Sequence, residues 1–83
     1  MQATAPITAV RISTDENTLT IVLADRTIQI PWSECSDKLA RAGAEQRRDA
    51  ELSPGGYGIH WPQLDEDLSV NGLVLAYDSR TTP

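Results

Sequence analysis

The chain has 83 residues, and its seven Lys or Arg side chains against twelve Asp or Glu give a formal net charge of −5 at pH 7. A chain of this length supports one hydrophobic core, so we expect a single domain over residues 1–83. The acidic balance disfavours nucleic acid and anionic membranes as partners, because both are bound through clustered basic residues. No apolar run approaches the roughly 20 residues that cross a bilayer.

A single cysteine, Cys35, excludes an intramolecular disulfide. The amino terminus has neither the basic region nor the long apolar stretch of a signal peptide. A free thiol without an export signal predicts a cytoplasmic protein. Because so short a chain builds a small core, packing or self-association must supply its stability, and a homodimer is one expectation.

Apolar and polar residues alternate over the first third of the chain, as they do in antiparallel strands with one buried face. Turn-forming residues at 15–17 and 24–26 divide this third into three strands. Leu19, Ile21 and Leu23 share the face expected to be buried. Pro31 should close the third strand, because proline has no N–H to donate to a neighbour. The pattern predicts a three-stranded meander.

A helix is predicted after the third strand. Ser33 or Ser36 can cap its start, and Gly43 can end it. Its apolar stripe consists of residues at helical spacing, namely Cys35, Leu39 and Ala42. A second short helix, almost without large apolar residues, is expected over residues 44–50.

The last third should begin with a loop at 53–56 and a short aromatic strand at 57–62, which Pro62 stops. A C-terminal helix is predicted next, with Asp67 or Ser69 as its N-cap. It rests on helix-like spacing of five apolar residues, namely Leu64, Leu68, Val70, Leu73 and Val74.

These elements together predict a small α+β domain: an antiparallel three-stranded meander followed by a helix, a short aromatic strand and a C-terminal helix. The core is expected over about residues 7–75. The polar tail at 78–83 is expected to be frayed.

The run Gly-Tyr-Gly-Ile-His-Trp-Pro-Gln-Leu-Asp-Glu-Asp-Leu over residues 56–68 resembles the signature of a bacterial family, the domain of unknown function 2442. The resemblance covers about residues 7–75, including the turn at Asp25-Arg26 and the strand end at Pro31-Trp32. It implies a compact α+β domain, sometimes joined to a DNA-binding helix-turn-helix for which this chain leaves no room. Members usually have Gly at the position of Arg26, which puts the tightness of that turn in question.

The family resemblance implies no activity and assigns no functional residue. Members are often encoded beside another very small protein, an arrangement similar to toxin–antitoxin pairs. That arrangement is an analogy and does not rest on the residues of this chain.

His60 and the acidic triplet, which we define as Asp65, Glu66 and Asp67, form the one titratable cluster in the sequence that could support catalysis or bind a metal. A histidine with two carboxylates can hold a divalent ion or serve in acid–base chemistry. Three consecutive acidic side chains point in different directions, however. The structural interpretation places them at the start of the last helix, where negative charge is favourable.

Three other features have a structural and a functional interpretation. Trp32 and Trp61 can fill the core or form an aromatic platform. The glycines of residues 55–58 lack the helix and the Lys of a phosphate-binding loop, and should instead permit a tight turn and a close strand approach. Cys35 is predicted to be a buried, inert thiol, so no catalytic residue is assigned.

We therefore expect a non-enzymatic protein-interaction module without a cofactor: an adaptor, a regulator or an antitoxin-like protein. The expected contact residues are His60, Trp61, Asp65, Glu66 and Asp67, whose acidic rim suits a small basic protein. The edge of the meander offers a second route, through strand addition, and could also form a homodimer. The alternative is a small-molecule or metal-ligand binding domain, or a weak enzyme, that uses His60 with Asp65 or Asp67.

Overall fold

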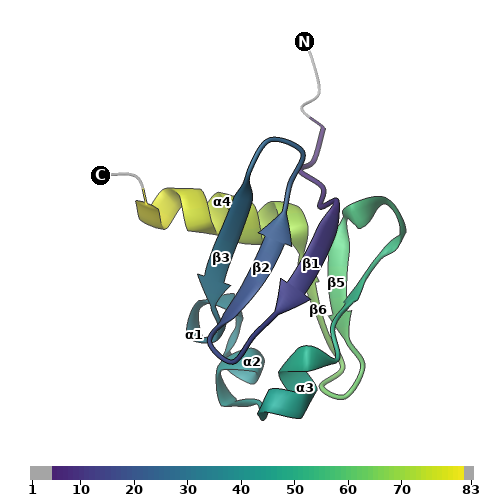
Figure 1. Ribbon diagram of the computed structural model, residues 1–83, viewed down its shortest axis with the longest axis vertical. Helices are drawn as coiled ribbons and strands as arrows, with labels where there is room; N and C mark the ends of the chain where they lie inside the picture. The colour runs from purple at the N-terminus through teal and green to yellow at the C-terminus, as the bar shows by residue number, and fades with distance from the viewer. Residues whose placement is uncertain (1–4, 82–83) are drawn as a thin grey trace.

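Figure 1 shows the structure, a computed structural model that describes residues 5–81. Three antiparallel strands form the first sheet in the order β1-β2-β3: Arg11–Thr14 (β1), Thr18–Val22 (β2) and Thr27–Pro31 (β3). The residues predicted to face inward, Leu19, Ile21 and Leu23, are buried. The predicted three-stranded meander is therefore confirmed.

Two different turns join these strands. In the first, the carboxylate of Asp15 accepts the backbone N–H groups of Thr18 and Asn17 at 2.7 and 2.8 Å, and these donors lower the pKa of Asp15. In the second, the Leu23 N–H donates to the Arg26 carbonyl at 2.7 Å. Asp65 is the only non-glycine residue with a positive φ within residues 5–81. Arg26 therefore turns the chain without the left-handed conformation that would require a glycine.

The single helix expected after β3 is replaced by two short ones, Trp32–Cys35 (α1) and Asp37–Arg41 (α2). Ser36 lies between them in an extended conformation, with φ −168° and ψ 164°. Its hydroxyl accepts the Leu39 N–H at 3.2 Å, so it caps α2 at the cost of continuity with α1. The predicted apolar stripe is thus divided, and of its members only Leu39 is fully buried. Ala44–Arg48 (α3) follows as expected.

A second three-stranded antiparallel sheet, in the order β4-β5-β6, was only partly foreseen. It consists of Glu51–Leu52 (β4), Gly58–Trp61 (β5) and Glu66–Ser69 (β6), with a 3₁₀ turn, Pro54–Gly56 (η1), between the first two. The predicted aromatic strand is β5. The other two strands had no clear signal, because β4 has two residues and β6 lies within a helix-like apolar spacing.

The prediction that the last helix includes Leu64 and Leu68 is wrong. Leu68 lies in β6 opposite Ile59 of β5, and the helix α4, Val70–Thr81, begins only after Ser69. Ser69 is the N-cap, since its hydroxyl accepts the Gly72 N–H at 3.0 Å. Pairing with β5 satisfies the backbone groups of Glu66 and Leu68, and this pairing overrides a helical apolar pattern that is short and irregular.

The expected fraying from residue 78 is also wrong for the described part of the tail. Helix α4 continues to Thr81, and two of its polar side chains form ion pairs with distant parts of the chain. Asp78 pairs with Arg26, and Arg80 pairs with Glu34. Residues 82 and 83 lie outside the described residues.

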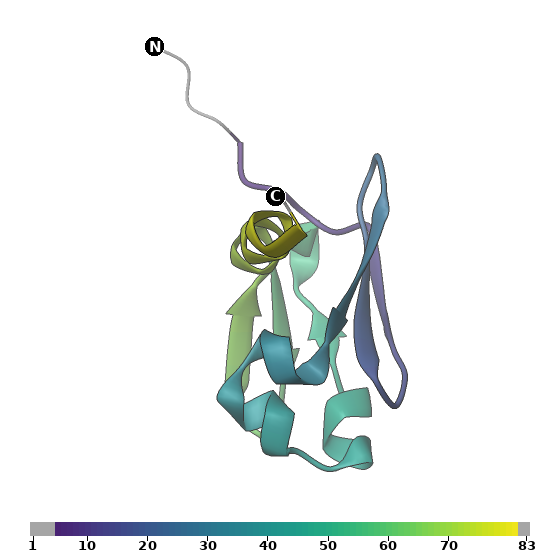
Figure 2. The same cartoon turned by 90° about the vertical axis from the view of Figure 1, so that its left-hand side faces the viewer.

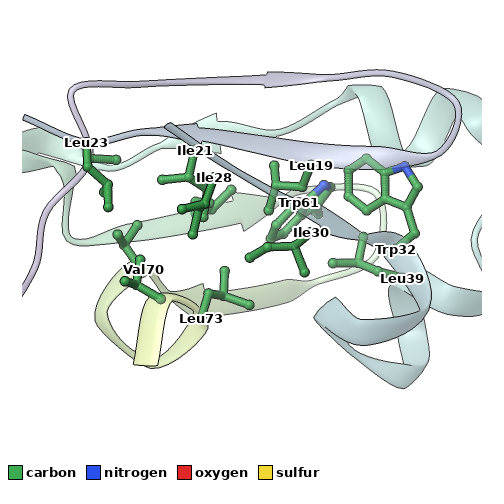
Figure 3. Packing of buried hydrophobic residues seen from close by; sticks show 13 residues of the cluster. Leu19, Ile21, Leu23, Ile28, Ile30, Trp32, Leu39, Trp61, Val70 and Leu73 are labelled. Atoms are coloured by element: carbon green, nitrogen blue, oxygen red, sulfur yellow. The ribbon is translucent and has the colours of Figure 1, made fainter. Parts of the chain in front are cut away.

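The core lies between the two sheets, which Figure 2 shows as two layers, with α4 across one end and α1 to α3 at the other. Figure 3 shows the packed side chains. The buried apolar residues come from both sheets and from α1, α2 and α4: Ala9, Leu19, Ile21, Leu23, Ile28, Ile30, Trp32, Leu39, Ile59, Trp61, Val70, Leu73 and Val74. Within residues 5–81, no helix is long and apolar enough to span a membrane.

Both tryptophans belong to this core. The rings of Trp32 and Trp61 meet edge to face, with centroids 6.3 Å apart and planes at 82°. Each indole N–H donates to a backbone carbonyl, that of Trp32 to Asp15 at 3.0 Å and that of Trp61 to Arg47 at 3.1 Å. Of the two interpretations left open by the sequence, the structure supports core filling and excludes an aromatic platform.

Candidate protein-interaction surface

The hairpin of β5 and β6 carries His60 and the acidic triplet. Its turn is closed by a hydrogen bond from the Leu64 N–H to the Trp61 carbonyl at 3.1 Å. Asp65 has φ 49° in this turn, a left-handed conformation that Asp tolerates better than most residues. The Lys38 ammonium donates to the carbonyls of Leu64 and Asp65 at 3.3 and 3.4 Å, so α2 holds the turn in place.

His60 and Asp67 lie directly opposite each other on β5 and β6. The Val70 N–H donates to the Tyr57 carbonyl at 3.0 Å, which makes residues 57 and 70 a hydrogen-bonded pair. Because such pairs alternate along antiparallel strands, His60 and Asp67 form a pair without mutual backbone bonds, in which side chains approach most closely. Their Nδ1 and Oδ1 atoms are 2.8 Å apart, and the two side chains are 40% and 76% exposed.

The outer face of the second sheet carries a row of three ionisable side chains. Ile59 and Trp61 of β5 point into the core, so His60 between them points outward. Glu51 of β4 is its partner on one side and Asp67 of β6 on the other. Figure 2 shows no further layer on this side of the sheet, so the row is open to solvent over the described part of the chain.

The acidic triplet does not converge on one point. Asp65 lies in the turn, Asp67 faces outward beside His60, and Glu66 lies on the opposite side of β6 and is half-buried. Within residues 5–81, no group of three or more His, Cys, Asp or Glu residues is placed to hold a metal ion. The expectation that the acidic triplet lies at the start of the last helix was wrong, because these residues form a turn and part of β6, and α4 begins after them.

Trp61 must be removed from the expected contact residues. Its side chain has no exposed surface and is held by the Arg47 carbonyl. Its place in β5 still matters, since it directs its neighbour His60 outward. The remaining candidates are His60, Asp65, Glu66 and Asp67, which we call the acidic surface; Asp65 and Asp67 are exposed, and His60 and Glu66 are half-buried.

Sequence reasoning missed a groove beside β6. It has a volume of about 220 Å³ and lies between α1, the end of β6 and the first turns of α4. Seven residues line it: Glu34, Cys35, Leu68, Ser69, Gly72, Leu73 and Ala76. These residues come from three separate segments, and only the pairing of β6 with β5 brings them together, so no local sequence signal could have revealed the groove.

Cys35 faces this groove but is a poor nucleophile. Burial raises the pKa of its thiol to about 12, and its Sγ lies 3.6 Å from the Pro31 carbonyl oxygen as a weak donor. The thiolate, which is the reactive form, is therefore scarce at neutral pH. Cys35 is half-buried where a buried thiol was expected, and its inertness stays a prediction.

Comparison with known proteins defines the class of this chain. The family model "Protein of unknown function (DUF2442)" matches residues 7–78, and the chain belongs to that family. It is similar to a protein of unknown function from Rhodospirillum rubrum whose crystal structure is known, with 29% sequence identity and a TM-score of 0.74 over 88% of this chain and 89% of the other. A search of curated proteins found no match.

Proposed function

We propose that this protein is a non-enzymatic interaction module of the bacterial cytoplasm, acting as an adaptor, a regulator or an antitoxin-like protein. It binds a small basic protein through the acidic surface. The observation that carries the proposal is the position of β6: it is an edge strand of the second sheet, and its Asp67 lies on a face that no other described element covers.

Charge supports a basic partner. The chain has a net charge of −5, and the acidic surface concentrates part of that charge on one hairpin. Complementary charges raise the rate of encounter and select against wrong partners more than they add to affinity. Binding should therefore weaken with added salt, since exposed charges are screened over about 8 Å at physiological ionic strength.

A homodimer is proposed to use the first sheet instead. Pairing β6 with β6 of a second copy would set acidic side chains near one another, and like charges on neighbouring strands are destabilising. The edge strand β1 has no acidic residue, and Val10 immediately before it is 67% exposed. Self-association through β1 would leave the acidic surface free for the basic partner.

The test compares the capture of proteins from the native cell extract by three tagged forms of the chain. The acidic-surface variant is Asp65→Asn, Glu66→Gln and Asp67→Asn, which keeps the shape of each side chain. The matched control removes the same number of charges outside the second sheet, at the exposed residues Glu16, Asp25 and Glu45.

The proposal predicts that the wild type and the control both recover one small basic protein, and that the acidic-surface variant does not. Equal recovery by the acidic-surface variant would refute the proposed contact. Equal loss by both variants would mean that only the net charge matters.

A further inference from the structure

The backbone of β6 has an unpaired side that faces solvent. Residues 57 and 70 form a hydrogen-bonded pair, so alternation assigns residues 59 with 68 and 61 with 66 to the same class. Asp67 and Ser69 belong to the other class, and their N–H groups point away from β5. The Asp67 carbonyl points the same way. Strand β6 has no neighbour on that side within residues 5–81.

This unpaired side borders the groove. Leu68 and Ser69 of β6 line the groove together with Glu34 and Cys35 of α1. In Figure 2, α4 lies above the end of β6 and α1 lies below α4. A segment that extended β6 outward would therefore lie along the opening of the groove.

The groove is suited to one apolar side chain. Its walls include the apolar groups of Cys35, Leu68, Leu73 and Ala76. Its volume of about 220 Å³ exceeds the roughly 150 Å³ of a dry cavity that accepts benzene. Glu34 at the rim is paired with Arg80, so its charge is already balanced.

We propose that the basic partner of the acidic surface contributes an extended segment that adds to β6 as a fourth strand of the second sheet. This inference rests on the proposed function and specifies its mode. Side chains alternate between the two faces of a strand. The residue opposite Asp67 then lies on the outer face beside its carboxylate, and its neighbour points toward the groove.

The segment so defined alternates basic and apolar residues. A Lys or Arg faces Asp67 on the outer face, where an opposite charge on a neighbouring strand is favourable. A Val, Ile or Leu on the other face enters the groove beside Leu68 and Leu73. A second copy of β6 does not meet this description, because its outward residues are Asp67 and Ser69.

The probe is a labelled synthetic peptide in which Lys or Arg alternates with Val, titrated with the whole protein and read by fluorescence anisotropy. The control peptide has the same composition, with its basic residues at one end and its valines at the other. Both have the same charge, so only strand addition distinguishes them.

Two substitutions at one position separate charge from backbone pairing. Asp67→Asn removes the charge and keeps the N–H, whereas Asp67→Pro removes both and takes no hydrogen bond from the β5–β6 ladder. We expect Asp67→Asn to weaken binding about threefold, and Asp67→Pro to weaken it about fivefold more, because a backbone hydrogen bond is also lost. Thermal unfolding of both variants shows whether the hairpin is intact.

A third variant, Ala76→Leu, extends a side chain into the groove from the exposed face of α4 and should weaken the alternating peptide several-fold. Strand addition is overturned if folded Asp67→Pro binds as well as Asp67→Asn, or if both peptides bind the wild type equally. In those cases weaker peptide binding by Asp67→Asn would still support the acidic surface as the contact site. Absence of binding by the alternating peptide would overturn the inference, while the capture experiment would judge the proposed function separately.

Discussion

Arg26 and Asp78 are 52 residues apart in the chain and are joined by two hydrogen bonds, Nη1 to Oδ1 at 2.8 Å and Nη2 to Oδ2 at 2.7 Å. This bidentate pair connects the turn between β2 and β3 to the last part of α4. It explains why the helix extends through a polar stretch that the sequence alone predicted to be frayed. Planar guanidinium and carboxylate groups fit each other in this geometry.

The Arg26–Asp78 pair should make stability depend on pH in the acid range. The hydrogen bond from Arg26 lowers the pKa of Asp78 below its ordinary value of 3.8. The contribution is therefore present above pH 3.8 and is lost as the pH falls through the lower folded-state pKa. We expect Asp78→Asn to have a lower Tm than the wild type near neutral pH, and the difference to shrink as the pH falls through the folded-state pKa of Asp78. A constant difference across this range would contradict the assignment.

Gly56 should tolerate no side chain. Gly56 has φ 76°, and a Cβ built there would lie 2.1 Å from the Ala9 carbonyl oxygen. The Ala9 N–H donates to the Gly56 carbonyl, so the two backbone segments are held close together. We expect Gly56→Ala to lower the free energy of unfolding by more than about 1 kcal/mol. Gly72→Ala is the control, because its Cβ would meet nothing nearer than 3.6 Å in a helix, and it should be neutral or stabilising. Urea unfolding measures both, and a neutral Gly56→Ala would show that Ala9 and Gly56 do not approach this closely.

Cys35 should react slowly in the folded protein. Because burial raises its pKa to about 12, very little thiolate is present at pH 8. We expect modification by a thiol-specific disulfide reagent to be slow without denaturant and fast in urea. Rapid modification of the folded chain would mean that the groove opens to expose the thiol.

Divalent metal ions should leave the stability unchanged. His60 has its Nδ1 against Asp67, and although Glu51 is the neighbour of His60 on β4, no three such side chains among the described residues are placed to hold a metal ion. A ligand that binds only the folded state at a hundredfold excess over its Kd adds roughly 3 kcal/mol. We expect no rise in Tm with zinc, manganese or magnesium. A rise that disappears in His60→Ala would instead support the alternative of a metal-ligand binding domain.

The first sheet could be predicted because its signals are local. Leu19, Ile21 and Leu23 recur at every second residue, as on one face of a strand, and each turn carries residues that reverse the chain. The aromatic strand was found for the same reason. For both tryptophans the sequence left two roles open, core filling and an aromatic platform. Only the contact between Trp32 of α1 and Trp61 of β5 decided in favour of the core.

The second sheet and the groove could not be predicted, because they depend on contacts between distant segments. Leu64 and Leu68 are spaced as on a helix. However, Leu68 pairs with Ile59 of β5, and Leu64 lies in the turn that follows β5. Glu51 was overlooked because a two-residue strand has no period to detect. The sequence shows that His60, Asp65, Glu66 and Asp67 are close along the chain, but their separation between a turn and the two faces of the sheet could not be predicted, and their role as contact residues stays a prediction.

A basic partner is proposed to bind the acidic surface on the β5–β6 hairpin. The most direct measurement follows the backbone amide resonances of the isotope-labelled protein while the alternating basic peptide is added. We expect shifts concentrated at His60 and at residues 65–69, reduced by salt and absent in the acidic-surface variant. Shifts centred on the first sheet, or spread over Glu16, Asp25 and Glu45 as strongly as over the hairpin, would contradict it.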